Sequence, residues 1–139
     1  NCMDIMIKLN VILFLAITCS AGEMMALPER FYLALSRVES NNNDKAIGRA
    51  GEKGRYQISF SYWHDSVNYA KIGGKWEDCL NKEYSEKIIT AYMNLYGKKF
   101  IQIKDYQRLA RIHNGGLNGH RQKSTLVYWR KVQRQLNRI

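Results

Sequence analysis

The chain has 139 residues, 45% of them hydrophobic and 24% charged, with a formal net charge of +10. This length fits one domain and excludes a second independent core, and no internal repeat, low-complexity tract or linker interrupts it. The charge favours polyanionic partners, which include nucleic acid, anionic lipid and the anionic polymers of a bacterial wall. Charge alone does not choose among these three.

Residues 1–21 are predicted to form a secretory signal peptide. A short, weakly positive start precedes an apolar run at 9–17, and small residues follow at 18–22. The apolar run is shorter than the ~20 residues that span a bilayer. We therefore expect cleavage near Ala21, a secreted or periplasmic protein, and no stable membrane insertion afterwards. An uncleaved anchor, a buried N-terminal helix and lipidation at Cys19 are the alternatives.

The domain at 22–139 keeps only one of the three cysteines, Cys79. It can form no intramolecular disulfide, and it offers no cysteine cluster for zinc. We interpret Cys79 as a buried small hydrophobe rather than a reactive thiol. The domain is expected to be a monomer that is held by its apolar core and needs no metal or other cofactor.

The first helix is predicted to begin near Pro28 and to end near Glu39. Pro28 favours the first turn, and four apolar residues recur on one helical face, namely Phe31, Ala34, Leu35 and Val38. Glu39 follows this face at the helix's C-terminal end, where the negative end of the dipole and partial burial would both raise its pKa. Such a carboxyl could act as a general acid near neutral pH. From the helix alone, a solvated glutamate is the favoured interpretation.

The rest of the chain is predicted to be mostly helical. Residues 41–54 have no helical period and are expected to be loops, and 55–59 could be a short extended piece. Gly97 is expected to end the third helix. The predicted fold class is α+β, predominantly α-helical, with a small irregular or β element after the first helix and later helices at 60–72, 81–96, 106–113 and 124–136.

Four short motifs follow one another in order, each with a defined spacing between its own residues. The first is Glu39-Ser40 with Asn43 and Ala46; the others are Gly51, Gly54 and Gln57, then Ile112-His113-Asn114-Gly115-Gly116, then Thr125, Tyr128-Trp129 and Val132. On these motifs the chain resembles the lytic transglycosylase (SLT-type) domains of the lysozyme superfamily, which are related to goose-type lysozymes. It looks close to short phage- or prophage-associated members. The resemblance covers about 28–132 and implies a lysozyme-like fold.

The resemblance implies that Glu39 is a catalytic acid and base that acts on peptidoglycan. It would protonate the oxygen of the β-1,4 bond between N-acetylmuramic acid and N-acetylglucosamine. It would then deprotonate the muramoyl C6 hydroxyl, whose attack on C1 gives a 1,6-anhydro end. Glycosidases that use water need two carboxylates. The candidates for a second one are Asp44, Glu52 and Asp65, and hydrolysis by a muramidase remains open.

The resemblance also implies a set of substrate-binding residues. Ser40 would fix the hydrogen bonds of the acid, and Tyr128 would orient it. Gln57 with the backbone of Tyr56 and Ile58 would line the cleft. Asn114, beside Gly115 and Gly116, would form the opposite wall together with His113. Gln57 and Asn114 could instead brace loops, and Tyr128 could be core.

Four positions depart from the family pattern. Gly48 replaces a serine that contacts substrate in the family, so that contact is missing or is supplied elsewhere. Arg55 and Tyr56 replace Leu-Met, which would make that wall polar and cationic. His113 replaces a tyrosine, and we favour packing or hydrogen bonding over catalysis for it.

Two other classes of function compete with a peptidoglycan-cleaving enzyme. A non-catalytic wall-binding module on the same fold is disfavoured because Glu39 is retained. Nucleic-acid binding would use the basic helical face of Arg130, Arg134 and Arg138. No helix-turn-helix or zinc pattern accompanies that face, and the leader argues against it. The expected partners are therefore glycan strands of peptidoglycan and anionic wall polymers, and not nucleic acid.

Overall fold

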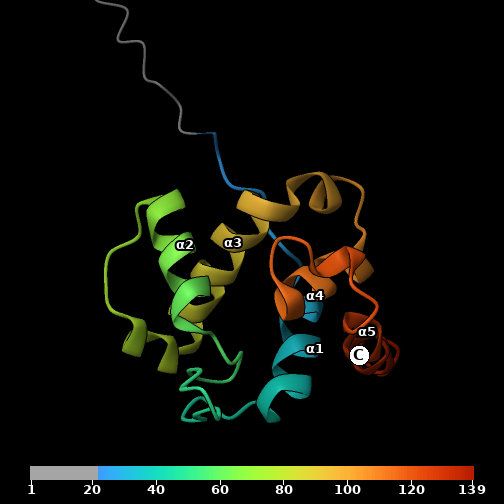
Figure 1. Ribbon diagram of the computed structural model, residues 1–139, viewed down its shortest axis with the longest axis horizontal. Helices are drawn as coiled ribbons and strands as arrows, with labels where there is room; N and C mark the ends of the chain where they lie inside the picture. The colour runs from blue at the N-terminus through green and yellow to red at the C-terminus, as the bar shows by residue number, and fades with distance from the viewer. Residues whose placement is uncertain (1–21) are drawn as a thin grey trace, which may run out of the picture.

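The computed structural model describes residues 22–139, and the predicted signal peptide at 1–21 lies outside them. The described chain forms five α-helices and two short 3₁₀-helices (Figure 1). The helices α2 and α3 pack together, α4 lies against α3, and α5 lies against both α1 and α4. In chain order the elements are α1 (Glu29–Ser40), α2 (Phe60–Ala70), η1 (Trp76–Leu80), α3 (Lys82–Gln102), α4 (Tyr106–Gly115), η2 (Gly119–Arg121) and α5 (Thr125–Leu136).

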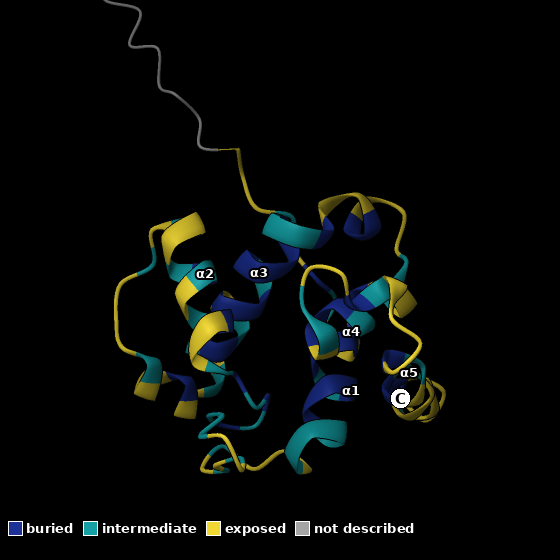
Figure 2. Cartoon of the chain, viewed as in Figure 1, coloured by how far each residue is buried: buried dark blue, intermediate teal, exposed yellow. Residues whose placement is uncertain are grey.

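The α1 helix has the predicted apolar face. Phe31, Ala34 and Leu35 are fully buried, and in Figure 2 the buried face of α1 is turned towards the other helices. The helix ends where Asn41 takes a left-handed conformation with φ 54°, and the Asn41 N–H bonds the carbonyl of Arg37. Glu39 is therefore fixed in the last helical turn, beside the loop that follows.

The segment between α1 and α2 is irregular, which agrees with one of the two predicted forms, whereas the β alternative and the extended piece at 55–59 are not confirmed. Residues 22–139 contain no strand. In this segment, isolated antiparallel bridges join Lys53 to Ile47 and to Ile58. Positive φ angles at Gly51, Gly54 and Gln57 turn the chain too often for a ladder to extend. The fold is predominantly α-helical, as predicted, and the β part of the predicted class is not confirmed.

Gly97 does not end α3, contrary to the prediction. It has φ −135° and ψ 19°, which kinks the helix, and the helix continues to Gln102. The last turns persist because Phe100 and Ile101 are buried in the core. A Cβ on Gly97 would lie 2.9 Å from Leu109 Cδ2, so the missing side chain also lets α4 approach α3.

The helix ends agree only partly with the sequence. Helix α2 ends at Ala70, before the predicted limit, because Lys71 turns to φ 55° and bonds the Val67 carbonyl. Ser124 precedes α5 as expected, but its hydroxyl makes no cap hydrogen bond. At the other end of α2, Ser59 is a true N-cap whose Oγ accepts from the Tyr62 N–H at 3.2 Å.

The loop and η1 meet at a position where only glycine fits. A Cβ on Gly54, which has φ +75°, would lie 2.0 Å from the backbone oxygen of Cys79. Cys79 itself is 1% exposed, which confirms it as a buried residue of the core. This contact holds the loop 41–59 against η1, which lies between α2 and α3 in the chain.

None of the helices described between residues 22 and 139 is long and apolar enough to cross a membrane.

Candidate active site

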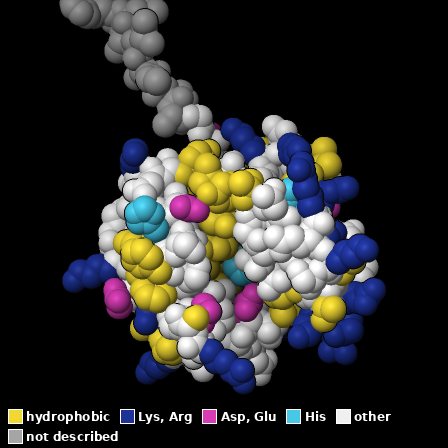
Figure 3. Space-filling view, viewed as in Figure 1, with side chains coloured by type: hydrophobic (Ala, Val, Ile, Leu, Met, Phe, Trp, Pro, Cys, Tyr) yellow, Lys and Arg dark blue, Asp and Glu magenta, His cyan; other side chains and the backbone are white. Residues whose placement is uncertain are grey.

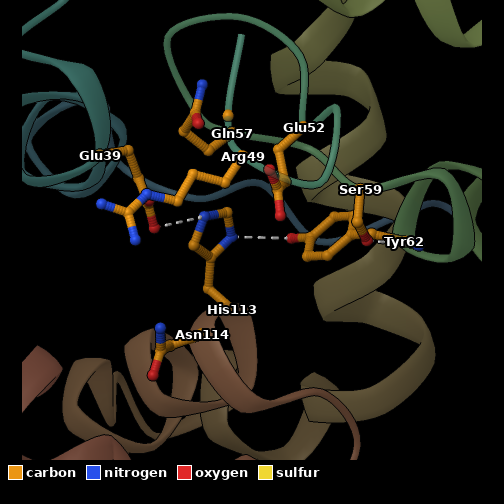
Figure 4. A pocket seen from close by; sticks show the side chains of 9 residues that line it. Glu39, Arg49, Glu52, Gln57, Ser59, Tyr62, His113 and Asn114 are labelled. Atoms are coloured by element: carbon orange, nitrogen blue, oxygen red, sulfur yellow. Dashed lines mark hydrogen bonds and ion pairs between the residues drawn. The ribbon is translucent and has the colours of Figure 1, made fainter.

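A polar cavity of about 330 Å³ opens where α1, α2 and α4 meet the loop 41–59. Figure 3 shows the corresponding hollow on the front face, with acidic side chains around a histidine, and Figure 4 shows its lining from close by. The lining residues are Glu39, Gly48, Arg49, Glu52, Gln57, Ser59, Tyr62, His113 and Asn114. They come from four separate segments, so the cavity exists only in the folded chain.

Glu39 points into this cavity from the last turn of α1, as the sequence predicts. Its side chain is 19% exposed, and Oε1 lies 3.5 Å from Nε2 of His113 at the end of α4. The carboxyl group can therefore reach a bound substrate while most of its surroundings are protein.

His113 is a hydrogen-bonding residue inside the site, which agrees with the role that we favoured for it. Its side chain is 3% exposed; Nδ1 lies 3.0 Å from the Tyr62 hydroxyl and Nε2 3.3 Å from the Tyr56 carbonyl. Since the carbonyl can only accept, Nε2 carries the hydrogen and Nδ1 accepts from Tyr62. The Nε2–H also faces Glu39, so His113 can orient the carboxyl.

Two buried tyrosines enclose the pair of Glu39 and His113. Burial raises the pKa of Tyr62 well above its usual value, and the nearby charge of Glu39 adds to this rise. Burial and then the charge of Glu39 raise the pKa of Tyr128 in the same way. Tyr62 stacks on Tyr92 with ring centroids 3.6 Å apart. Both hydroxyls therefore stay neutral, and Tyr62 is held where it can donate to His113.

Tyr128 is close to the acid but is not a regular hydrogen-bonding partner. It is 8% exposed, and no atom of the described residues completes a hydrogen bond to its buried hydroxyl. Its ring centroid lies 6.4 Å from that of His113. Tyr128 therefore packs behind the acid. It lies near Glu39, as the predicted orienting role requires, but it is buried like a core residue.

Glu52 is the one of the three candidate second carboxylates that lines the cavity. Asp44 instead accepts two hydrogen bonds from Arg55, at 2.6 and 3.2 Å, and Asp65 accepts from the Tyr96 hydroxyl at 2.7 Å. In Figure 4, Glu39 and Glu52 enter the cavity from opposite sides. The site therefore holds two carboxylates, one from a helix and one from a loop.

The absence of a side chain at Gly48 leaves room for Glu52. A Cβ on Gly48 would lie 2.0 Å from Glu52 Oε2 and 2.6 Å from Gln57 Oε1. The backbone N–H of Ala50 donates to the same Glu52 oxygen at 3.1 Å. Where the resembled family has a serine, Gly48 leaves a space, and the Glu52 carboxylate fills it.

The remaining polar walls come from Gln57, Asn114 and Arg49. Gln57 and Asn114 line the cavity as predicted. Gln57 has φ 51°, and its Nε2 donates to the Gly54 carbonyl at 2.9 Å, so it also braces its own turn. Arg49 reaches from the loop towards Glu39 in Figure 4 and gives the cavity a cation beside the two acids.

Three predicted site residues have side chains outside the cavity. The Ser40 hydroxyl donates to the Arg55 carbonyl at 2.9 Å and accepts from the Asn43 N–H at 3.0 Å, so it holds the loop against α1. Tyr56 is 1% exposed and donates to Glu86 at 2.7 Å, and Ile58 is fully buried. Because Tyr56 and Ile58 are core residues, only the Tyr56 backbone, through its bond to His113, supports the site.

The predicted cationic wall at Arg55 is wrong, because its guanidinium pairs with Asp44. This pair holds the pKa of Asp44 below its usual range. The two glycines after Asn114 also differ from expectation. A Cβ on Gly115 would lie 2.7 Å from Thr125 Cγ2, so Gly115 serves the contact between α4 and α5.

Sequence reasoning missed Ser59, Tyr62 and Arg49 as parts of the site. Ser59 had a usable signal, since a serine before a helical period is a typical N-cap and so marks where α2 enters the site. Tyr62 and Arg49 had none, because one is an aromatic residue within a helical segment and the other lies in a polar loop.

Metal ligation has no clear candidate in this region. Within residues 22–139 no group of three or more His, Cys, Asp or Glu side chains is arranged to hold a metal ion.

The comparisons with known proteins identify a family. The family described as Destabilase matches residues 32–135. "Lysozyme 1" of Crassostrea virginica is 39% identical over 83 residues, which are 59% of this chain and 44% of that protein. "Lysozyme" of Ostrea edulis is 36% identical over 89 residues, 63% of each chain. The chain therefore spans about half to two thirds of the length of these relatives.

Solved structures with the same fold include lysozymes of bivalve molluscs. The Tapes japonica lysozyme aligns with a TM-score of 0.66 and 28% identity over 76% of this chain and 88% of its own. The Meretrix lusoria lysozyme, solved in complex with Aeromonas hydrophila PliI, aligns with a TM-score of 0.63 and 26% identity over 82% and 93%. The resemblance to SLT-type domains thus gave the broad lysozyme-like fold correctly, but the matching family is a different one.

Proposed function

The chain belongs to the Destabilase family, and we propose that it is a muramidase, which hydrolyses the β-1,4 bond between N-acetylmuramic acid and N-acetylglucosamine in peptidoglycan. The observation that carries the proposal is the pair of carboxylates, Glu39 and Glu52, in one polar cavity. Relatives named lysozymes support it.

Glu39 supplies the proton in this proposal. Its carboxyl donates to the glycosidic oxygen as the bond to C1 breaks, and the leaving sugar departs as a neutral alcohol. His113 is a positioning residue here, since its Nε2–H faces the Glu39 carboxylate at 3.5 Å and limits its rotation. After departure of the leaving group, Glu39 accepts a proton from water.

Glu52 is the second carboxylate. It faces the positive charge that develops at C1 from the loop side of the cavity, opposite Glu39 in Figure 4. A transglycosylase does without this group, since the C6 hydroxyl of its substrate supplies the attacking oxygen. The presence of Glu52 in the cavity therefore favours attack by water over formation of a 1,6-anhydro end.

Gln57 and Asn114 provide amide groups on facing walls of the cavity. Both can exchange hydrogen bonds with the acetamido and hydroxyl groups of the sugars. We also propose that residues 1–21 direct secretion, which would bring the enzyme to its wall substrate, and that it acts as a monomer.

The test compares Glu39→Gln and Glu52→Gln with Glu77→Gln, which changes an exposed carboxylate on η1. Clearing of purified peptidoglycan should fall about 10²- to 10⁴-fold for Glu39→Gln, the range for loss of a general acid. Glu52→Gln should also lose most activity, and Glu77→Gln should keep it. Circular dichroism should show all three variants folded. Full activity in either cavity variant would contradict the assignment.

A further inference from the structure

Positive charge is concentrated in the last third of the chain. Asp105 is the single acidic residue of the 12 in the sequence that lies after Glu86, whereas 12 of the 22 Lys and Arg residues do. Figure 3 shows Lys and Arg side chains gathered on the right-hand side of the view, where the C-terminal elements lie. The twelve cations are Lys87, Lys98, Lys99, Lys104, Arg108, Arg111, Arg121, Lys123, Arg130, Lys131, Arg134 and Arg138.

Some of these cations line a second cavity, distinct from the site that holds Glu39. It has a volume of about 640 Å³ and lies between the C-terminal end of α3, the first turn of α4 and η2. Its lining is Lys99, Phe100, Gln102, Ile103, Arg108, His120 and Arg121. It shares no residue with the cavity around Glu39, and it contains no carboxylate among its lining residues.

The Phe100 ring organises the cationic groups of this cavity. The Lys99 Nζ lies 5.0 Å from the ring centroid, and the Arg108 Cζ lies 5.6 Å from it. The His120 ring meets Phe100 edge-on with centroids 5.1 Å apart. Arg108 is further held by the carboxylate of Asp105. Lys99 and Arg108 are thus gathered around one buried ring rather than spread apart as their repulsion would favour.

His120 reports the resulting electrostatic field. Its pKa is lowered, first by burial and then by the charges of Arg121, Lys99, Arg108 and Arg111. Its Nδ1 is buried, and no other atom of the described residues forms a hydrogen bond with it. A neutral ring in a field of four cations indicates a cavity with a strongly positive potential and no internal counter-charge of equal size.

We propose that this cavity, lined by Lys99, Arg108, His120 and Arg121, binds a phosphate-class oxyanion. Guanidinium and ammonium donors suit the several oxygens of such a group, and Arg can bind it through two hydrogen bonds at once. Two sources share this chemistry, free inorganic phosphate and the phosphodiester chain of an anionic wall polymer. The polymer as source rests on the proposed function, whereas the oxyanion site itself does not.

The experiment follows the ring resonances of His120 by NMR while inorganic phosphate, or poly(glycerol phosphate), is added at constant ionic strength. An anion in the cavity opposes the surrounding cations, so the pKa of His120 should rise and its resonances should shift saturably. His64, which lies on α2 outside the cavity, is the internal reference. Tighter binding of the polymer than of phosphate would identify the wall source, and equal binding would identify free phosphate.

The matched variants separate a built site from general charge. The double change Lys99→Gln and Arg121→Gln should weaken phosphate binding at least about tenfold, because each change removes a charged hydrogen-bond donor from the cavity. The double change Arg134→Gln and Arg138→Gln on α5 removes the same charge from outside the cavity and should change binding less than about twofold.

Absence of a saturable His120 shift, or equal weakening by both pairs of changes, would overturn the proposal. Because binding is measured without peptidoglycan, this result is independent of whether Glu39 and Glu52 cleave glycans.

Discussion

Single residues shape the active cavity both where a side chain is absent, as at Gly48, and where a side chain forms hydrogen bonds, as at His113. Gly48 contributes no side chain, and the Glu52 carboxylate occupies the space that a Cβ there would need. His113 contributes hydrogen bonds with Tyr62 and with the Tyr56 carbonyl. The chemistry of Glu39 therefore depends on neighbours that are not themselves acids or bases in the reaction.

Gly48→Ala should strongly reduce peptidoglycan clearing. The new Cβ would lie 2.0 Å from Glu52 Oε2, so the second carboxylate must move out of position. A displacement of this kind costs on the order of 10²-fold in rate. The change should cost little stability, because the neighbour that must move is a side chain and not the backbone.

Gly73→Ala is the control, since a Cβ at Gly73 meets no atom within 4 Å. Comparison of the initial clearing rates and the thermal midpoints of the two variants checks the prediction. An active Gly48→Ala enzyme would show that Glu52 is not required where the structure places it.

Residue identity made part of the site predictable. Glu39 could be found because the motifs after it lie in register with it, although its helix alone favours a solvated glutamate, and the same register includes Gln57. Glu52 could only be named as one of three acids, because which acid faces the cavity depends on Arg55 and Tyr96 binding the other two. These pairings join residues far apart in sequence, and no periodicity records them.

At the scale of elements, the active site depends on a loop that is held from below by η1. Gly54 and Cys79 approach so closely that no side chain fits between them. The Cys79 carbonyl also accepts from the Ser85 hydroxyl at 2.7 Å, which links η1 to α3. The helices were predictable from apolar periodicity, whereas η1 and the turns were not, because their residues follow no repeating pattern. The prediction that Gly97 ends α3 was wrong because burial of the residues after Gly97 outweighs the low helix propensity of glycine.

The contact between η1 and the loop should make the fold sensitive to alkali. Burial raises the pKa of the Cys79 thiol from 9.0 to about 12. Above pH 9 the unfolded thiol loses its proton while the folded one keeps it, so the free energy of unfolding falls as the pH rises towards 12. The loss that is due to Cys79 should be on the order of 1 kcal/mol at pH 10.

Urea unfolding of the protein and of Cys79→Ala from pH 7 to pH 10 checks this prediction. The variant should be less stable at pH 7, because it loses a buried side chain, but its stability should fall less steeply above pH 9. The buried tyrosines titrate in both proteins and cancel in the comparison. Parallel curves would show that Cys79 ionises as readily in the folded protein as in the unfolded chain.

Over the whole molecule, the carboxylates of the active cavity and the cations of the second cavity lie in different parts of the chain. The two carboxylates of the active cavity, Glu39 and Glu52, come from the N-terminal half of the described chain, and the cationic cavity is built from the C-terminal third. This division places the proposed cleavage site and the proposed oxyanion site on different parts of one domain. The net charge could be read from the sequence. That the cations gather in a cavity apart from the two carboxylates follows only from the packing of α3, α4 and η2.

The most direct test of the central claim is product analysis in water labelled with heavy oxygen. We expect cleaved peptidoglycan to carry reducing N-acetylmuramic acid ends with one labelled oxygen at C1, because a water molecule that gives its proton to Glu39 attacks that carbon. Mass spectrometry of the separated fragments distinguishes these ends from 1,6-anhydro ends, which contain no oxygen from the solvent. Predominantly anhydro ends would contradict hydrolysis and the role given to Glu52.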